Sequence, residues 1–199
     1  RNDGTREALV SQGSNPHYLT AVKFNPDRLV LTMDINELVT ACDVIILATP
    51  SIYLADTIEK MTCDYSGKIF ASVIKGIVPK HNDIVANYLR DTFKIGYRSQ
   101  AVLAGPCHAE EVAMERLSFL TVAAANKETT QMLSDLLSSR YIRINQSNDI
   151  LGNEYSAVLK NIYAIGAGMA NGLGYGDNFQ AVYISNAVRE LERILDAVY

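Results

Sequence analysis

The stretch CDVIILATP, residues 42–50, contains a continuous apolar run that ends at a proline. Residues 44–48 have the length of a strand and no alternation of polar residues, which is typical of a strand buried on both faces of a parallel sheet. Residues 51–61 follow with helical spacing of their apolar side chains. The two segments together predict the first half of a βαβ unit.

The same alternation continues toward the C-terminus. Strands are predicted over 68–74, 101–104, 119–124 and 141–145, with helices over 81–93, 109–115 and 128–137. From residue 151 onward no strand candidate remains, and two long helices are predicted over 152–171 and 178–199. The sequence therefore predicts an α/β domain with a mainly parallel sheet over residues 1–148, followed over 149–199 by the start of an all-helical domain.

Composition narrows the class of protein. The 199 residues are 48% hydrophobic, which is enough for a substantial core. Twenty-two acidic against 18 basic residues give a net charge of −4 with no basic run, which argues against nucleic-acid binding. No apolar stretch approaches the ~20 residues of a membrane span, and the first residues lack the charged-then-apolar pattern of a leader, so we expect no secretion. Three cysteines without CxxC spacing indicate free thiols. We expect a cytoplasmic protein bound to neither nucleic acid nor membrane, and a homodimer is compatible with the sequence.

Gly, Pro or polar residues follow three of the predicted strands, at 49–51, 75–77 and 105–107. In open parallel sheets, ligands bind beyond the carboxyl ends of the strands. Lys75 at this edge would suit a phosphate or a developing alkoxide, and the alternative is an ordinary solvated lysine. The Gly-rich dinucleotide fingerprint GxGxxG is absent from the chain.

Lys160 lies within AVLKNIYA, residues 157–164, which is almost wholly apolar. Burial would lower the pKa of a lysine into a range useful for proton transfer. The alternative is a lysine that extends its ammonium to the surface. We expect a functional role, since charges are rarely buried without one.

The segment CHAEE, residues 107–111, admits a metal site or a Cys–His nucleophile. A second cluster of ligand residues is missing, so no metal site is predicted. We instead expect a helix N-terminus whose free N–H groups attract an anion.

Several of these segments together resemble the bacterial-type NAD(P)-dependent glycerol-3-phosphate dehydrogenases. The similar segments are NPHYL at 15–19, ATPS at 48–51, VIKGI at 73–77, GPCHAEEVA at 105–113 and VLKNIYAIGAGMANGLGYGDN at 158–178. The resemblance covers essentially the whole chain in the family's order. It implies a Rossmann domain followed by a helical substrate domain, with the active site in the cleft between them.

The resemblance also implies roles for single residues. Lys160 corresponds to the catalytic lysine, which also binds substrate, and Lys75 to a lysine that contacts both substrate and cofactor. Gly105 and Cys107 correspond to a substrate-binding loop, and Ala109 in the same loop to a cofactor contact. The family commonly has Ser where this chain has Cys107, and a thiol is the weaker hydrogen-bond donor.

The cofactor implied is NAD or NADP, and the sequence does not decide between them. Pro50 is expected at the cofactor edge of the sheet, and Arg1 where an arginine would meet the 2′-phosphate of NADP. The family's GxGxxG loop would precede Arg1, and its later substrate motif would follow Tyr199. We therefore expect the chain to be the middle of the enzyme and to be inactive alone.

The reaction implied is hydride transfer between NAD(P)H and dihydroxyacetone phosphate, giving sn-glycerol 3-phosphate for glycerophospholipid synthesis. Two alternatives remain open at this point. One is another two-domain NAD(P) dehydrogenase, of the hydroxyacid or ketopantoate type. The other is a nucleotide-binding or scaffold fragment without catalysis.

Overall fold

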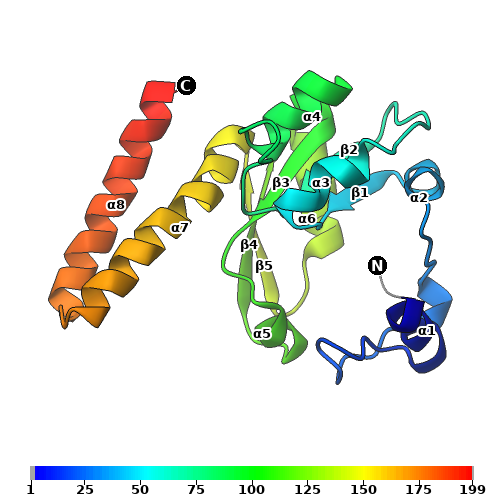
Figure 1. The fold of residues 1–199 in the computed structure, drawn as a ribbon, viewed down its shortest axis with the longest axis horizontal. Coiled ribbons are helices and arrows are strands. Elements are labelled where there is room, and N and C mark those ends of the chain that lie inside the picture. The colour runs from blue at the N-terminus through cyan, green and yellow to red at the C-terminus, as the bar shows by residue number, and fades with distance from the viewer. Residues whose placement is uncertain (1–2, 199) are drawn as a thin grey trace.

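A computed structural model describes residues 3–198 and consists of a five-stranded sheet, helices on both of its faces and a long helical hairpin (Figure 1). The strands are β1 Val44–Leu47, β2 Ile69–Ser72, β3 Gln100–Ala104, β4 Ser118–Ala124 and β5 Ile142–Ser147. The helices are α1 Asp3–Gln12, α2 Ile35–Ala41, α3 Ser51–Ile58, α4 Val85–Phe93, α5 Ala109–Ala113, α6 Lys127–Leu137, α7 Ile150–Gly172 and α8 Asp177–Val198. Short 3-10 helices span Pro26–Arg28 and Tyr97–Ser99. Each strand and helix predicted from residue 44 onward is present, although α4 begins at Val85 and not at residue 81, whereas α1 and α2 were not predicted.

The sheet has the strand order β1-β2-β3-β4-β5. Strands β1, β2 and β3 pair in parallel, as do β4 and β5, which confirms a mainly parallel sheet. The βαβ unit predicted around α5 is wrong, because β3 and β4 pair antiparallel, with Ala104 opposite Thr121. A helix of five residues is only about 7.5 Å long. It cannot carry the chain back along β3, so β4 runs back instead.

Alternate residues of the strands point to the two faces of the sheet, and both faces are covered by helices. One face, with Phe70 and Val102, packs against α3, α4 and the start of α7. The other face, with Ala101 and Leu103, packs against Leu133 of α6. Burial on both sides is most complete at β3, which explains its continuous apolar run, whereas Ile46 of β1 and Phe119 of β4 are exposed.

The chain leaves the sheet at α7, whose N-terminus is capped by Asp149 through a 2.8 Å hydrogen bond from the Gly152 amide. The first turns of α7 pack against β3 and α4, and the helix then extends away from the sheet beside α8 (Figure 1). All strands in the described residues precede Asp149, and both long helices follow it. The division into domains at residues 148 and 149 stays a prediction. No helix within residues 3–198 is both long enough and apolar enough to span a bilayer.

Candidate active site

A cavity of about 490 Å³ lies where the loop after β3 faces α7. It brings together four residues singled out from the sequence, which lie up to 85 positions apart: Lys75, Gly105, Cys107 and Lys160. The face of α7 that lines the cavity presents Asn153, Ser156, Ala157 and Lys160 at helical spacing. Lys75 and the loop at Gly105 approach from the carboxyl ends of β2 and β3, as the ligand-edge rule predicts.

A second cavity, of about 410 Å³, lies beyond the ends of β1 and β2. Residues 48–51 and 73–76 line it, including Pro50 and Lys75. Leu47 at the end of β1 pairs with Ser72 at the end of β2, so the segments 48–51 and 73–76 leave the sheet at the same level. Since Lys75 lines both cavities, the two cavities adjoin each other at this side chain.

The second cavity fits part of a dinucleotide. It adjoins the N-terminus of α3, which has Pro50 as its N-cap and no side-chain hydrogen bond to its first amides. Such amides attract phosphate groups. Gly76 also lies close to Ser51, and a Cβ at Gly76 would come within 3.0 Å of the Ser51 hydroxyl oxygen. The close approach of the turn at Gly76 to the turn at Ser51 therefore favours glycine at position 76.

The burial expected for Lys160 is wrong, because its side chain is exposed. Its Nζ donates a 3.2 Å hydrogen bond to Oδ1 of the neighbouring Asn161. At this level α7 has left the sheet, and exposed apolar side chains such as Ile162 and Ile165 flank the lysine. The apolar sequence around Lys160 thus reflects a helix face that the described residues leave open, and the argument from burial does not apply here.

The charge of the first cavity is positive. Among its lining residues the ionisable groups are Lys75, Lys160, Cys107 and His108, and none is a carboxylate. Two ammonium groups at one cavity favour a small anionic ligand, because no acidic residue of the lining neutralises them. The pattern suits a phosphorylated substrate.

Gly105 turns the chain sharply at the end of β3. Its φ of 129° lies in a region that favours glycine, and a Cβ there would lie 2.6 Å from the Phe119 carbonyl oxygen. Any larger residue would push the loop away from β4. Gly105 therefore shapes the cavity through its backbone.

Comparison with known proteins identifies the family. Residues 1–130 match the family model described as NAD-dependent glycerol-3-phosphate dehydrogenase N-terminus, and residues 149–199 match the corresponding C-terminus model. The chain belongs to the NAD-dependent glycerol-3-phosphate dehydrogenase family. The family consists of oxidoreductases, so the resemblance stated from the sequence is confirmed.

Curated relatives of this family include glycerol-3-phosphate dehydrogenases [NAD(P)+] from Latilactobacillus sakei and Prosthecochloris aestuarii. The first is 32% identical, with 97% of this chain and 58% of the relative covered. The second is 33% identical, with 96% and 58% covered. A solved glycerol-3-phosphate dehydrogenase from Coxiella burnetii has the same fold, with a TM-score of 0.84 at 24% identity over 98% of this chain and 59% of that one. The chain thus spans a little over half the length of these relatives.

One predicted cofactor contact, Ala109, lies apart from these two cavities. Ala109 is exposed at the start of α5 and lines a different cavity of about 940 Å³, whose lining includes residues 21–24. Arg1 lies outside the described residues.

The NPHYL segment at 15–19 and the GPCHAEEVA segment at 105–113 contact each other, since the Tyr18 hydroxyl donates a 2.6 Å hydrogen bond to Glu110. Within residues 3–198 no group of three His, Cys, Asp or Glu side chains is placed to hold a metal ion.

Replacement of Cys107 by serine is expected to leave kcat within about threefold of wild type and to lower KM for the phosphorylated substrate slightly. Cys107 is a free, half-buried thiol at the cavity, and a hydroxyl donates a better hydrogen bond than a thiol. Steady-state kinetics would measure both constants, with Cys42→Ser as a control at another half-buried free thiol. A thousandfold loss of activity in folded Cys107→Ser protein would reveal thiol chemistry instead.

Glu154 of α7 is a buried carboxylate that the sequence analysis missed. Its side chain is fully buried, and its two oxygens each accept a 3.0 Å hydrogen bond, from the amides of Val85 and Ala86 at the start of α4. The helical spacing of Ile150, Glu154 and Ala157 is the signal that could have found it, because all three are buried on the side of α7 that faces the sheet domain.

The stability of the protein should depend on pH through Glu154. Burial raises the pKa of its carboxyl to about 7, against the lowering effect of the Ala86 and Val85 amides, and the charge of Asp83 adds to the rise. Because the folded-state pKa exceeds the usual value of 4.5, the protonated carboxyl of Glu154 stabilises the fold fully below pH 4.5. This contribution is lost as the pH rises through about 7. The loss is on the order of 3 kcal/mol, at about 1.4 kcal/mol for each pKa unit.

The measurement is the free energy of unfolding in urea for wild type and Glu154→Gln, from about pH 5 to about pH 8. We expect the free energy of the wild type to fall relative to that of the variant as pH rises. Parallel curves over this range would show that Glu154 does not titrate there.

Proposed function

We propose that the protein transfers a hydride between NAD(P)H and carbon 2 of dihydroxyacetone phosphate, giving sn-glycerol 3-phosphate for glycerophospholipid synthesis. The observation that carries the proposal is the cavity shared by Lys75 and Lys160, which has two ammonium groups and no carboxylate in its lining. Membership of the glycerol-3-phosphate dehydrogenase family supports the same reaction.

In the proposed reaction Lys160 is the general acid. Its ammonium gives a proton to the ketone oxygen of the substrate as the carbon–oxygen double bond is reduced, and the neutral amine takes the proton back in the reverse direction. Lys75 holds the substrate at the point where the two cavities adjoin, which makes the approach effectively intramolecular. Gly105 and Cys107 complete the substrate site.

Pro50 and Lys75 would hold the cofactor, NAD or NADP, in the cavity beyond β1 and β2. When bound, the nicotinamide ring supplies the hydride. Ala109 remains a proposed cofactor contact that this geometry does not support, and Arg1, which lies outside the described residues, remains a proposed one. Residues 1–148 would form the cofactor domain, and residues 149–199 would belong to the helical substrate domain.

The three free thiols favour a cytoplasmic location. The negative net charge favours a small-molecule partner over nucleic acid. A homodimer stays a prediction.

A substrate panel tests the proposal. The purified full-length protein is incubated with NADH or NADPH and, in turn, dihydroxyacetone phosphate, ketopantoate and a small 2-keto acid, while the absorbance of the reduced cofactor is followed. We expect turnover on the order of 10 per second with dihydroxyacetone phosphate alone. Preference for either of the other substrates would overturn the assignment of the substrate.

A further inference from the structure

The N-terminus of α4 obtains its cap from a distant part of the chain. The first amides of a helix have no partner within the helix, and α4 has Ile84 as N-cap, without a side-chain hydrogen bond. Glu154, 68 and 69 positions away, accepts from both Ala86 and Val85. A carboxylate at this end of a helix is stabilised by the helix dipole and by charge-assisted hydrogen bonds.

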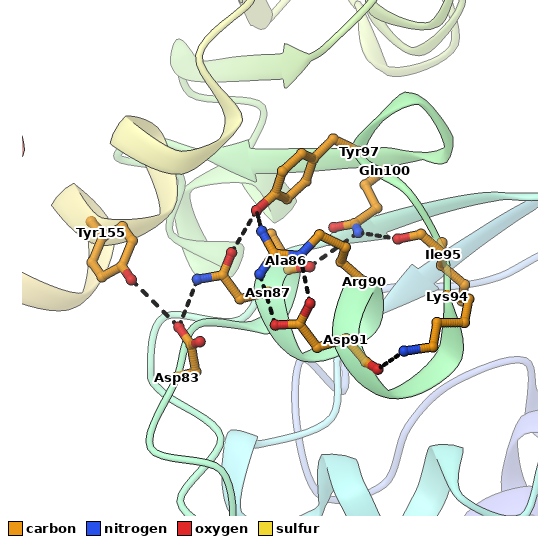
Figure 2. A network of polar contacts seen from close by, with 10 residues as sticks. All are labelled: Asp83, Ala86, Asn87, Arg90, Asp91, Lys94, Ile95, Tyr97, Gln100 and Tyr155. Carbon is orange, nitrogen blue, oxygen red and sulfur yellow. Dashed lines mark hydrogen bonds and ion pairs between the residues drawn. The ribbon is translucent and has the colours of Figure 1, made fainter. Parts of the chain in front are cut away.

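A second polar contact joins the same two helices (Figure 2). The Tyr155 hydroxyl donates to Oδ1 of Asp83 at 3.4 Å, and the same oxygen accepts from Nδ2 of Asn87 at 2.8 Å. The Tyr97 hydroxyl donates to Oδ1 of Asn87 at 2.7 Å, which continues the network toward β3. Consecutive residues of α7 are thus bonded to α4 and to the turn before it.

These contacts fix the helix that carries Lys160. Glu154 lies about 100° around α7 from Asn153, one of the residues that line the cavity. Lys160 lies six residues beyond Glu154, which is about 9 Å along the helix axis. Rotation of α7 about its axis would therefore break the bonds of Glu154 and carry Lys160 away from Lys75.

We propose that Glu154 is a positioning residue, which sets the rotation of α7 so that Lys160 faces the substrate beside Lys75. This inference rests on the proposed function. Glu154 itself lines neither the cavity nor the predicted cofactor site, and it acts through Lys160.

The test is a double-mutant cycle in the full-length protein, with Glu154→Gln, Lys160→Ala and the double variant. Gln keeps the size of the side chain but retains one acceptor oxygen for two amides. We expect Glu154→Gln alone to lower kcat about 10- to 100-fold, the effect of a misplaced catalytic group. KM for the reduced cofactor should stay unchanged, because α7 does not line the cofactor cavity.

In the Lys160→Ala background, Glu154→Gln should cause no further loss of kcat, because the group that it positions is already absent. A purely structural role would lower kcat by the same factor in both backgrounds, and that result would overturn the inference. So would a kcat equal to that of wild type in the single variant. Glu128→Gln, at an exposed helix N-terminus away from the cavities, is the matched control and should leave activity unchanged.

Thermal unfolding verifies that each variant is folded at the assay temperature. If Glu154→Gln does not fold, Glu154→Asp takes its place in the cycle, since it keeps the carboxylate but withdraws it by one methylene. A wild-type protein that does not reduce dihydroxyacetone phosphate would overturn the proposed function, and this inference with it. Normal wild-type activity with equal losses in the two backgrounds would overturn this inference alone.

Discussion

Replacement of Lys160 by alanine in the full-length protein is expected to lower kcat about 10²- to 10⁴-fold, the usual contribution of a general acid. Lys160 lines the cavity opposite the loop at Gly105, on the same side of α7 as Asn153 and Ala157. In the alanine variant no ammonium donates a proton, so negative charge would develop on the ketone oxygen next to the methyl group of alanine. Steady-state kinetics at saturating substrate measures the loss.

Two further variants separate proton transfer from charge. Lys160→Arg keeps a positive charge but cannot give up its proton, so we expect a loss of kcat close to that of alanine together with a smaller rise in KM. Lys127→Ala, at the exposed first turn of α6, is the matched control and should be neutral. Activity of Lys160→Ala within about threefold of wild type would remove this residue from the mechanism.

The second large effect is expected at Lys75. Replacement by alanine should lower kcat/KM about 10- to 100-fold, the equivalent of one charge-assisted hydrogen bond of about 1.5–3 kcal/mol. Lys75 lines both cavities, so KM should rise for the substrate and for the reduced cofactor together. Its ammonium makes no hydrogen bond or ion pair within residues 3–198, which leaves it available to a ligand.

Initial rates with each ligand varied in turn would measure the two KM values. Lys60→Ala is the control, because Lys60 is exposed just beyond the C-terminal end of α3, whereas the cofactor cavity adjoins the N-terminus of that helix. Unchanged kcat and KM values in Lys75→Ala would make Lys75 an ordinary surface lysine.

The sequence predicted the sheet well because its strands carry a strong local signal. The run at 44–48 is apolar on both faces of the sheet. Ile45 and Leu47 pack against α3 and α4, whereas Ile46 on the other face is exposed, so burial on both faces is wrong for this strand. The direction of β4 could not be read in this way. It depends on whether five-residue α5 can carry the chain back along the sheet, which is a matter of helix length in three dimensions.

The candidate site was predicted in part. Strand-end rules located Lys75 and Gly105, and an unusual charge in an apolar helix pointed to Lys160. The burial expected for Lys160 is wrong, since the buried ionisable group of α7 is Glu154 and Lys160 is exposed. Glu154 stands between Asn153 and Tyr155 in the sequence, without the apolar neighbours that single out Lys160. The packing of the first turns of α7 against α4 buries it. The helical spacing of Ile150, Glu154 and Ala157 indicates a buried face, but its partner at the start of α4, almost 70 residues away, leaves no local pattern.

The most direct test of the account follows the hydride itself. The full-length protein is supplied with dihydroxyacetone phosphate and with NADH or NADPH that carries deuterium at both positions of nicotinamide carbon 4. The product is then examined by NMR. The account predicts sn-glycerol 3-phosphate with deuterium on carbon 2. Product without deuterium at that carbon, or no product with either cofactor, would contradict it.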